Sequence, residues 1–337
     1  MNADLTIIIP SYNRGKYIRE CLDSIFMQET SYSYQLIVAD DHSTDNSVEI
    51  IKEYQAKYPN KITFLESNIN QKLYKNVLRA YEITKTPYFT VLDPDDFWID
   101  KNFIQNSLDF LEKNKDFTIY AANAYVQNEY DINSRKPFVD IKQEKNITLQ
   151  DFLKTPAFIG WTGATIFRNS IFMNGIPDKM VNLEHPTCEK SFRGDSFRNL
   201  IALNKGKCHF CPKITSVYRQ TDSGIYAGGT DLDRDILNIR LYINLWNYFD
   251  KKYPELLLVA YKIYKNTKEN LYSYIKKETN LDVLKIKISE LEELDKIFKS
   301  NKKLLFKTTV KKAKPKYKIF LLIFRKLEKK LKRKGLI

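Results

Sequence analysis

The sequence predicts an α/β protein built on a doubly wound, mostly parallel sheet of Rossmann-like type, followed by a C-terminal helical extension. Three observations support this fold class. Short apolar runs of strand length alternate with stretches whose apolar residues recur at helical spacing, the connections between them are short, and polar clusters follow the apolar runs. Because parallel strands end at one edge of a sheet, these polar clusters are expected to lie together.

The first part of the chain alternates regularly between the two periods. Strands are expected at residues 5–9, 34–39, 62–65 and 88–92, and helices at 16–27, from a cap at Ser43 or Thr44 to about 58, at 73–84 and at 103–113. Further strands are expected at 117–126, 158–167 and 207–218, a loop or hairpin at 128–145, and a helix at 195–204. From about residue 232 the period stays helical, which places a boundary near residue 230.

The net charge of +14 belongs to the C-terminal tail. Residues 302–337 contain 15 Lys or Arg and one acid, and the remainder is balanced at 40 basic against 40 acidic residues. The chain opens without a basic and then apolar segment, has no apolar run of spanning length, and has too few cysteines for a disulfide framework. A cytoplasmic protein is expected. A basic tail binds phosphates without specificity, and no nucleic-acid module is recognised, so no specific nucleic-acid partner is expected.

The chemistry is expected to centre on the acids that follow the fourth predicted strand. The apolar run at residues 88–92 stops at Asp93, Asp95 and Asp96. Three carboxylates this close repel one another and attract a cation, and a small number of hard oxygen ligands suits Mg²⁺ or Mn²⁺ shared with a phosphate. The competing interpretation is a solvated acidic turn that caps the next helix.

A structural zinc site is the alternative metal hypothesis. His185 and Cys188 are separated from Cys208 and Cys211 by nineteen residues, close to a zinc-ligand spacing. However, Cys208 and Cys211 fall in a predicted strand, where residues three apart point to opposite faces. Buried thiols are the favoured interpretation.

Three segments together resemble the nucleotide-sugar-dependent glycosyltransferases of family 2, which have the GT-A fold. They are the stretches at 6–14 (TIIIPSYNR), 37–45 (IVADDHSTD) and 92–98 (LDPDDFW), and their order and spacing match as well. The resemblance is clear over residues 5–126, patchier to about 230 and absent beyond. It implies a glycosyltransferase domain at 1–230. The helical period and the charge of the remainder predict a helical region at 231–300 and a basic amphipathic tail at 301–337.

The resemblance implies a uridine-type nucleotide across the first two strand ends. Pro10 and Tyr12 are expected to flank the base, Asn13 and Arg14 belong to the same binding stretch, and Asp41 is expected to accept from the imide N–H of the base. The competing interpretation of Asp41 is a charge that favours the N-terminus of the next helix.

The third loop departs from the family pattern. Lys72 stands where the family often has Gly, which leaves the role of this loop open. The pair Lys75 and Asn76 falls where a basic residue followed by Asn often contacts the nucleotide or the sugar.

The family pattern also assigns the acidic cluster and a late arginine. It puts a divalent ion on the diphosphate through Asp95 and Asp96, with Asp93 near the ribose or the ion. Arg219 is expected to pair with phosphate. The family often has a His shortly afterwards, whereas Gln220 follows here.

Inversion at a sugar carbon needs a base on the acceptor side, and the resemblance implies Asp195 for this role. Gly194 replaces the usual Glu before it, and the competing role of Asp195 is a helix N-cap. The loop at 224–229 is a candidate cover for the diphosphate or an ordinary linker. Trp161 is a candidate acceptor platform or simply a core residue.

The implied activity is that of an inverting, metal-dependent, hexosyltransferase-type enzyme. It uses a UDP-sugar and a glycan or lipid-linked acceptor in synthesis of a surface polysaccharide such as lipopolysaccharide or capsule. The alternatives are an inactive sugar-nucleotide-binding relative and a protein that binds nucleic acid or an anionic surface through its tail. The tail is expected to lie on the inner face of an anionic membrane, or to pack on the body. The helices at 232–300 are candidates for self-association.

Overall fold

The computed structural model describes residues 3–154, 159–181, 194–221, 230–277 and 280–312. Tertiary contacts divide the chain into two compact units, Met1–Gly228 and Gly229–Ile337. The strands are β1 (Leu5–Ser11), β2 (Tyr34–Asp40), β3 (Ile62–Leu65), β4 (Tyr88–Val91), β5 (Phe97–Trp98), β6 (Phe117–Asn128), β7 (Asp131–Pro137), β8 (Lys145–Ile147), β9 (Thr165–Arg168) and β10 (Lys207–Gln220). The helices of the first unit are α1 (Ile18–Phe26), α2 (Ser47–Lys57), α3 (Lys72–Ile83), α4 (Phe103–Lys113), α5 (Leu149–Lys154), the short 3₁₀ turn η1 (Thr162–Ala164), α6 (Asp178–Val181) and α8 (Gly194–Leu203).

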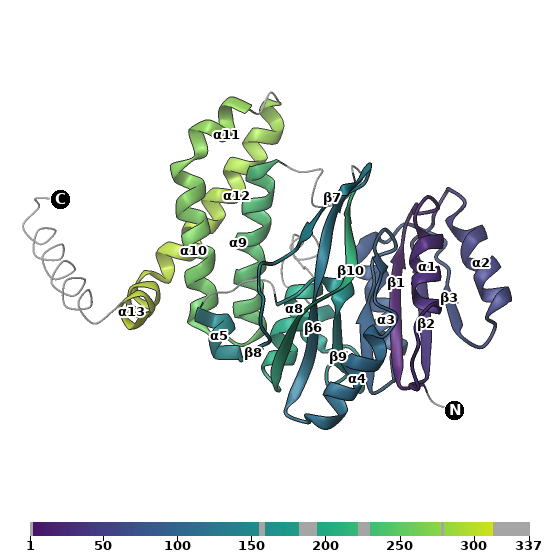
Figure 1. Ribbon diagram of the computed structural model, residues 1–337. Helices are drawn as coiled ribbons and strands as arrows, with labels where there is room; N and C mark the ends of the chain where they lie inside the picture. Colours follow the sequence, from purple (N-terminus) through teal and green to yellow (C-terminus); the bar gives the residue numbers. More distant parts are fainter. Residues whose placement is uncertain (1–2, 155–158, 182–193, 222–229, 278–279, 313–337) are drawn as a thin grey trace, which may run out of the picture. The chain divides into compact units, whose positions relative to one another are not determined.

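The strands of the described residues form one sheet in the order β3-β2-β1-β4-β9-β6-β10-β5, with β7 added on β6 and β8 on β10 (Figure 1). The pairs among β1, β2, β3 and β4 are parallel, as is β6 with β10, whereas β9 runs antiparallel to both of its neighbours. The predicted mostly parallel α/β sheet is therefore confirmed.

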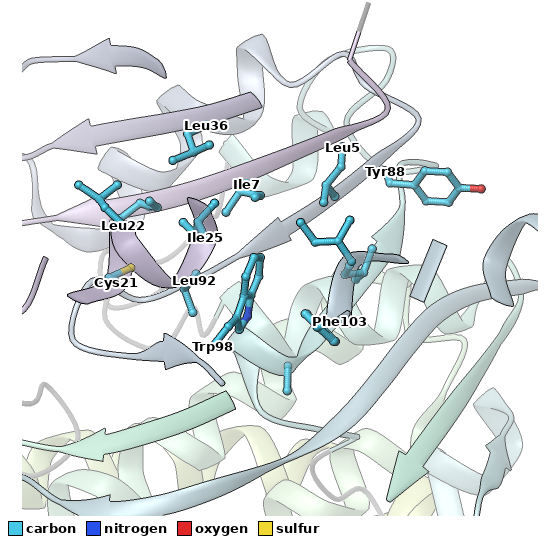
Figure 2. Packing of buried hydrophobic residues seen from close by; sticks show 14 of the residues in the cluster. Leu5, Ile7, Cys21, Leu22, Ile25, Leu36, Tyr88, Leu92, Trp98 and Phe103 are labelled. Atoms are coloured by element: carbon cyan, nitrogen blue, oxygen red, sulfur yellow. The ribbon is translucent and has the colours of Figure 1, made fainter. Parts of the chain in front are cut away.

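The sheet is covered on both faces because its central strands are apolar on both sides. Leu5, Ile7 and Ile9 of β1 pack into one core with α1, α2 and α4. Figure 2 shows part of this core, in which Ile7 and Leu36 lie near Leu22 and Ile25 of α1. On the other face α3 packs on β1 and β2, and Tyr81 stacks on Phe172 with Phe89 at its edge. This two-sided burial is what a near-continuous apolar strand requires.

Two local expectations proved wrong. Neither Ser43 nor Thr44 caps α2, which begins at Ser47 after Asn46, a residue without a side-chain cap bond. The hydroxyl of Ser43 is used elsewhere, as described below. The stretch predicted as one strand at 158–167 instead makes the turn η1 before the short strand β9, and residue 158 lies outside the described residues. A Cβ on Gly163 would lie 2.7 Å from Leu92 Cδ1, so this turn packs closely on the residue that follows β4, and a larger residue requires the Leu92 side chain to shift.

The loop or hairpin expected at 128–145 contains β7, which pairs antiparallel with β6.

The second unit is helical in its described part. It contains α9 (Asp231–Tyr248), α10 (Pro254–Glu269), α11 (Leu271–Lys277), α12 (Leu281–Ser300) and α13 (Lys302–Lys312). Thr230 and Asp233 form a capping box that starts α9, and Asn280 caps α12. Among the residues described, no helix has both the length and the apolar character needed to cross a membrane.

Candidate active site

Three loops meet at the carboxyl edge of the sheet. They follow β1, β2 and β4, which are neighbouring parallel strands, and they span residues 11–15, 40–47 and 92–96. Ser11 is level with Asp40 in the β1–β2 register, and the backbone N–H of Asp41 donates to the Ser11 carbonyl. The convergence of the polar clusters expected from the sequence is therefore present in the fold.

The first loop is fastened to the second by side chains. The N–H of Asn13 donates to Ser43 Oγ at 2.8 Å, and Asn13 Oδ1 accepts from the N–H of Thr44 at 2.7 Å. Asn13 and His42 both have left-handed backbones, with φ of 50° and 67°. Asn and His adopt this conformation more readily than most residues, so the two loops are shaped locally and then locked together.

The next two residues of the first loop are held in the same way. The N–H of Arg14 donates to Ser47 Oγ at 2.8 Å, and the N–H of Gly15 donates to Asp45 Oδ2 at 2.9 Å. A Cβ on Gly15 would lie 1.8 Å from Asn46 Oδ1, so a larger residue here requires the Asn46 side chain to move. The loop at residues 40–47 thus fixes the backbone that carries Arg14.

Asp40 and Asp41 are both buried at the end of β2. The Asp40 carboxylate accepts from the N–H and the hydroxyl of Ser43. Asp41 Oδ1 accepts from the N–H of Gln71 at 2.7 Å, which ties it to the start of α3. Because α2 begins only at Ser47, the interpretation of Asp41 as a charge in the first turn of that helix does not describe its position.

The other members of the expected nucleotide site differ in exposure. Pro10 is buried inside β1, and Tyr12 is 43% exposed beside it. Lys75 is exposed on α3, whereas Asn76 is buried, with its amide donating to the carbonyl of Ala39 at 2.7 Å. Asn76 therefore joins α3 to the end of β2.

Lys72 has a left-handed backbone, with φ of 71°. Glycine adopts this conformation at little cost, whereas other residues pay about 1–2 kcal/mol. The glycine that the family often has at this position therefore has a backbone explanation.

The three central acids have different partners. Both oxygens of Asp96 accept hydrogen bonds: Oδ1 from the backbone N–H of Arg219 at 2.9 Å, and Oδ2 from the indole N–H of Trp161 at 2.5 Å. Asp95 Oδ2 lies 3.3 Å from Arg14 Nε. Asp96, 1% exposed, is thus committed to the fold, whereas Asp95 faces the first loop.

The electrostatics of the cluster fit a divalent cation. Burial and the negative charge of Asp95 raise the pKa of Asp93 to about 7, and burial followed by the charges of Asp95 and Asp93 raises the pKa of Asp96 well above its usual range. Within the described ranges no three His, Cys, Asp or Glu side chains form a metal cage. Hard carboxylate oxygens in small number suit Mg²⁺ or Mn²⁺ that is also bound by ligand phosphates. The candidates for such an ion are the acids of this cluster, of which Asp96 is buried with 1% exposed.

Asp195 lies in the first turn of α8, and its Oδ1 accepts from the N–H of Ser196 at 2.8 Å. Its charge contributes to the raised pKa of Asp93, and that of Arg198 opposes it. The fold therefore brings the expected base near the acidic cluster, although the two are a hundred residues apart in sequence.

Arg219 has partners within the protein. Its guanidinium pairs with Glu20 at 2.5 Å and lies over the rings of Tyr17 and Phe97, with centroids 5.2 and 5.0 Å away. Its side chain is 8% exposed. In this structure Arg219 joins β10 to α1, rather than standing open to a phosphate.

Sequence reasoning missed Arg198 and did not foresee the contact that Trp161 makes in the site. Arg198 is 4% exposed and donates to the hydroxyl of Tyr81. The sequence pattern that could have indicated it is its position three residues after Asp195, which places both residues on the same helix face. Trp161, considered only as an acceptor platform or a core residue, stacks on Tyr218 and holds Asp96. No sequence signal linked Trp161 to Asp96.

Two of the four residues in the zinc hypothesis, His185 and Cys188, lie outside the described residues, as does the loop at 224–229. Cys208 is buried in β10 and Cys211 is half-buried. Burial raises the pKa of the Cys208 thiol, so the thiol stays protonated in the metal-free protein.

Known proteins resemble this chain over the region that forms the site. Residues 6–175 match the family model described as glycosyl transferase family 2. Glycosyltransferase GlyG of Streptococcus pneumoniae is 24% identical over 269 residues, 77% of this chain and 83% of that protein. The uncharacterised protein Rv1520 of Mycobacterium tuberculosis is 25% identical over 222 residues, 66% of this chain and 60% of that protein, so the match spans less than two thirds of this relative.

A solved structure shares the fold. S. aureus TarS 1-349, in complex with UDP-GlcNAc, has a TM-score of 0.59 and 16% identity over 86% of this chain and 79% of that one. At this identity the likeness concerns the fold, which is GT-A. Together with the family model, which covers about half of the sequence, it leads to one conclusion: this chain belongs to glycosyl transferase family 2.

Proposed function

We propose that this chain transfers a hexosyl group from a UDP-sugar to a hydroxyl of a glycan or lipid-linked acceptor, with inversion, in the synthesis of a surface polysaccharide. The observation that carries the proposal is the meeting of three loops at the ends of β1, β2 and β4, with Arg14, Asp41 and Asp95 on them. The TarS complex supports the choice of nucleotide, because a similar fold binds UDP-GlcNAc there.

The nucleotide end of the proposed donor site lies over the first two strand ends. Asp41 accepts from the imide N–H of uracil, and Gln71 fixes the carboxylate for this contact. Tyr12 and Pro10 flank the base, with Tyr12 as the more exposed of the two. Lys75, exposed on the first turns of α3, is proposed to contact a phosphate or the sugar.

The acidic cluster is proposed to hold the diphosphate end. Asp95 and Asp93 are the carboxylates that bind a divalent ion, Mn²⁺ or Mg²⁺, which offsets negative charge on the leaving diphosphate when it is bound. Asp96 is 1% exposed and each of its oxygens already accepts a hydrogen bond, from Arg219 and from Trp161, so it is less open to an ion than Asp95. We therefore assign Asp96 to positioning and Asp95 to metal binding.

Asp195 is proposed as the base. It takes the proton of the acceptor hydroxyl while the hydroxyl oxygen bonds to the anomeric carbon and the bond from that carbon to the diphosphate oxygen breaks. UDP leaves with the bonding electrons. Acceptor attack from the face opposite the diphosphate produces inversion.

Calorimetric titration of the full chain with UDP and with GDP, each with and without Mn²⁺, tests this function. The expected result is UDP binding that Mn²⁺ strengthens, with weaker binding of GDP. UDP-sugars are titrated next, and the one with the highest affinity identifies the donor. An absence of UDP binding under every metal condition would overturn the proposal.

The basic tail is proposed to hold the enzyme at the inner face of an anionic membrane, near a lipid-linked acceptor. Residues 313–337 lie outside the described residues, so this rests on composition. Removal of residues 312–337 is expected to lower co-sedimentation with anionic vesicles and to leave UDP affinity unchanged. Equal sedimentation of the truncated protein would count against it. Self-association through the second unit likewise stays a prediction.

A further inference from the structure

Asp95 already has a cation beside it. Arg14 Nε lies 3.3 Å from Asp95 Oδ2, and the two side chains are 17% and 16% exposed. Both are therefore partly buried, where an ion pair is screened less than at the surface. The hydroxyl of Thr221 also approaches Asp95 Oδ2, at 3.5 Å.

The backbone that carries Arg14 is fixed, while its side chain has alternatives. Ser47 and Asp45 hold the N–H groups of Arg14 and Gly15, and Ser43 holds that of Asn13. The guanidinium also donates to the carbonyl of Asn13 at 3.2 Å, a contact with its own loop that moves with it. A side chain on a rigid base can exchange one partner for another without rearrangement of the fold.

Arg14 and a divalent ion compete for the same carboxylate oxygen. A cation that approaches Asp95 in the free protein meets a positive charge in the place it would occupy. A nucleoside diphosphate removes this conflict, because its phosphate oxygens accept bidentate hydrogen bonds from a guanidinium and also provide ligands for the ion. Arg14 can then leave Asp95 without losing an anionic partner.

We propose that Arg14 is the resident counter-ion of Asp95, and that it makes metal binding conditional on the nucleoside diphosphate. This inference rests on the proposed function, since it requires a diphosphate in the crevice. In the free enzyme Arg14 protects Asp95 from divalent ions. In the donor complex the same guanidinium moves to the diphosphate, so one residue sets the order in which the ligands bind.

Mn²⁺ binding to the full-length protein without nucleotide is the decisive measurement. Arg14→Gln removes the charge and keeps a polar side chain. It is expected to bind Mn²⁺ about tenfold more tightly than the wild type, a typical size for coupling between two sites. The matched control is Arg19→Gln, which removes an arginine paired with Glu53 on the exposed side of α1 and α2 and should leave Mn²⁺ affinity unchanged.

UDP titrations complete the test. Without metal, Arg14→Gln is expected to bind UDP more weakly than the wild type, because the diphosphate loses its guanidinium. Arg14→Met repeats both titrations with an apolar stem, and circular dichroism melts establish that each variant is folded. Equal Mn²⁺ affinity of the wild type and both folded variants, with UDP binding intact, would overturn the inference alone. Failure of the wild type to bind UDP would overturn the proposed function instead.

Discussion

The buried charges of the helical unit differ from the acid cluster of the first unit in how far the protein itself neutralises them. In the helical unit Arg240 and Lys287 are each 8% exposed, and each has carboxylate partners, Glu290 and Glu293 for the first and Asp233 for the second. In the crevice of the first unit, acids of like sign lie together instead, and burial with their mutual repulsion raises the pKa of Asp93. A paired charge is complete within the protein, whereas a like-charged cluster is completed by a ligand.

The direction of the pKa shifts expresses the same contrast. Burial by itself would raise the pKa of Asp233. Hydrogen bonds from Thr230 and the charge of Lys287 outweigh this effect and lower that pKa. Its stabilising contribution is therefore present above the unfolded pKa and is lost as pH falls through the folded one. For Asp93 the raised pKa means that the folded state binds its proton more tightly than the unfolded state does. Between these two pKa values, a rise in pH costs stability in the absence of a cation.

If the crevice acids serve chemistry, their loss should reduce turnover more than any other change. Asp195→Asn keeps the shape and removes the base, so the rate of UDP release from the donor sugar is expected to fall by about 10²–10⁴-fold. UDP affinity should stay as in the wild type. The control is Asp116→Asn, a surface acid paired with Lys207 in the same unit. Full turnover by Asp195→Asn would remove Asp195 as the base, and an inactive wild type that binds UDP would favour the inactive relative.

The adjacent residues Asp95 and Asp96 allow ligand binding and structural support to be compared within one loop. Asp95→Asn is expected to remove the Mn²⁺ dependence of UDP binding and to leave the free energy of unfolding nearly unchanged. Asp96→Asn is expected to lower the free energy of unfolding by about 1–3 kcal/mol, because a buried N–H of Trp161 or Arg219 loses its acceptor. Titration and urea unfolding measure both. The reverse pattern would make Asp96 the metal ligand.

The helical unit should respond in stability alone. Asp233→Ala removes the capping box of α9 and the partner of Lys287, and is expected to lower the free energy of unfolding by about 1–2 kcal/mol, mostly through the cap. UDP affinity should not change. Asp282→Ala, which breaks an exposed pair with Lys285, is the control and should have little effect. A loss of UDP affinity in Asp233→Ala would contradict the separation of roles.

Much of the fold could be predicted because periodicity is a local property. The strand Ile62–Leu65 and the helix Phe103–Lys113 have the predicted bounds, and the mostly parallel sheet followed from alternating periods and short connections. Helix starts were less predictable. Serine is a favoured N-cap residue, but the hydroxyl of Ser43 donates to Asp40 and accepts from the N–H of Asn13 instead. Only the folded chain brings Asn13 near Ser43.

The sequence by itself determined which residues gather at the crevice, because strand ends of a parallel sheet share one edge. It did not determine what each side chain does there. Asp95 and Asp96 are adjacent in sequence, yet one faces Arg14 and the other holds Trp161 and Arg219, which are 65 and 123 residues away. Such partners are chosen by packing among distant segments, and they decide which carboxylate remains for a ligand. Tertiary structure alone made that choice, because burial and hydrogen bonding depend on what lies across the crevice.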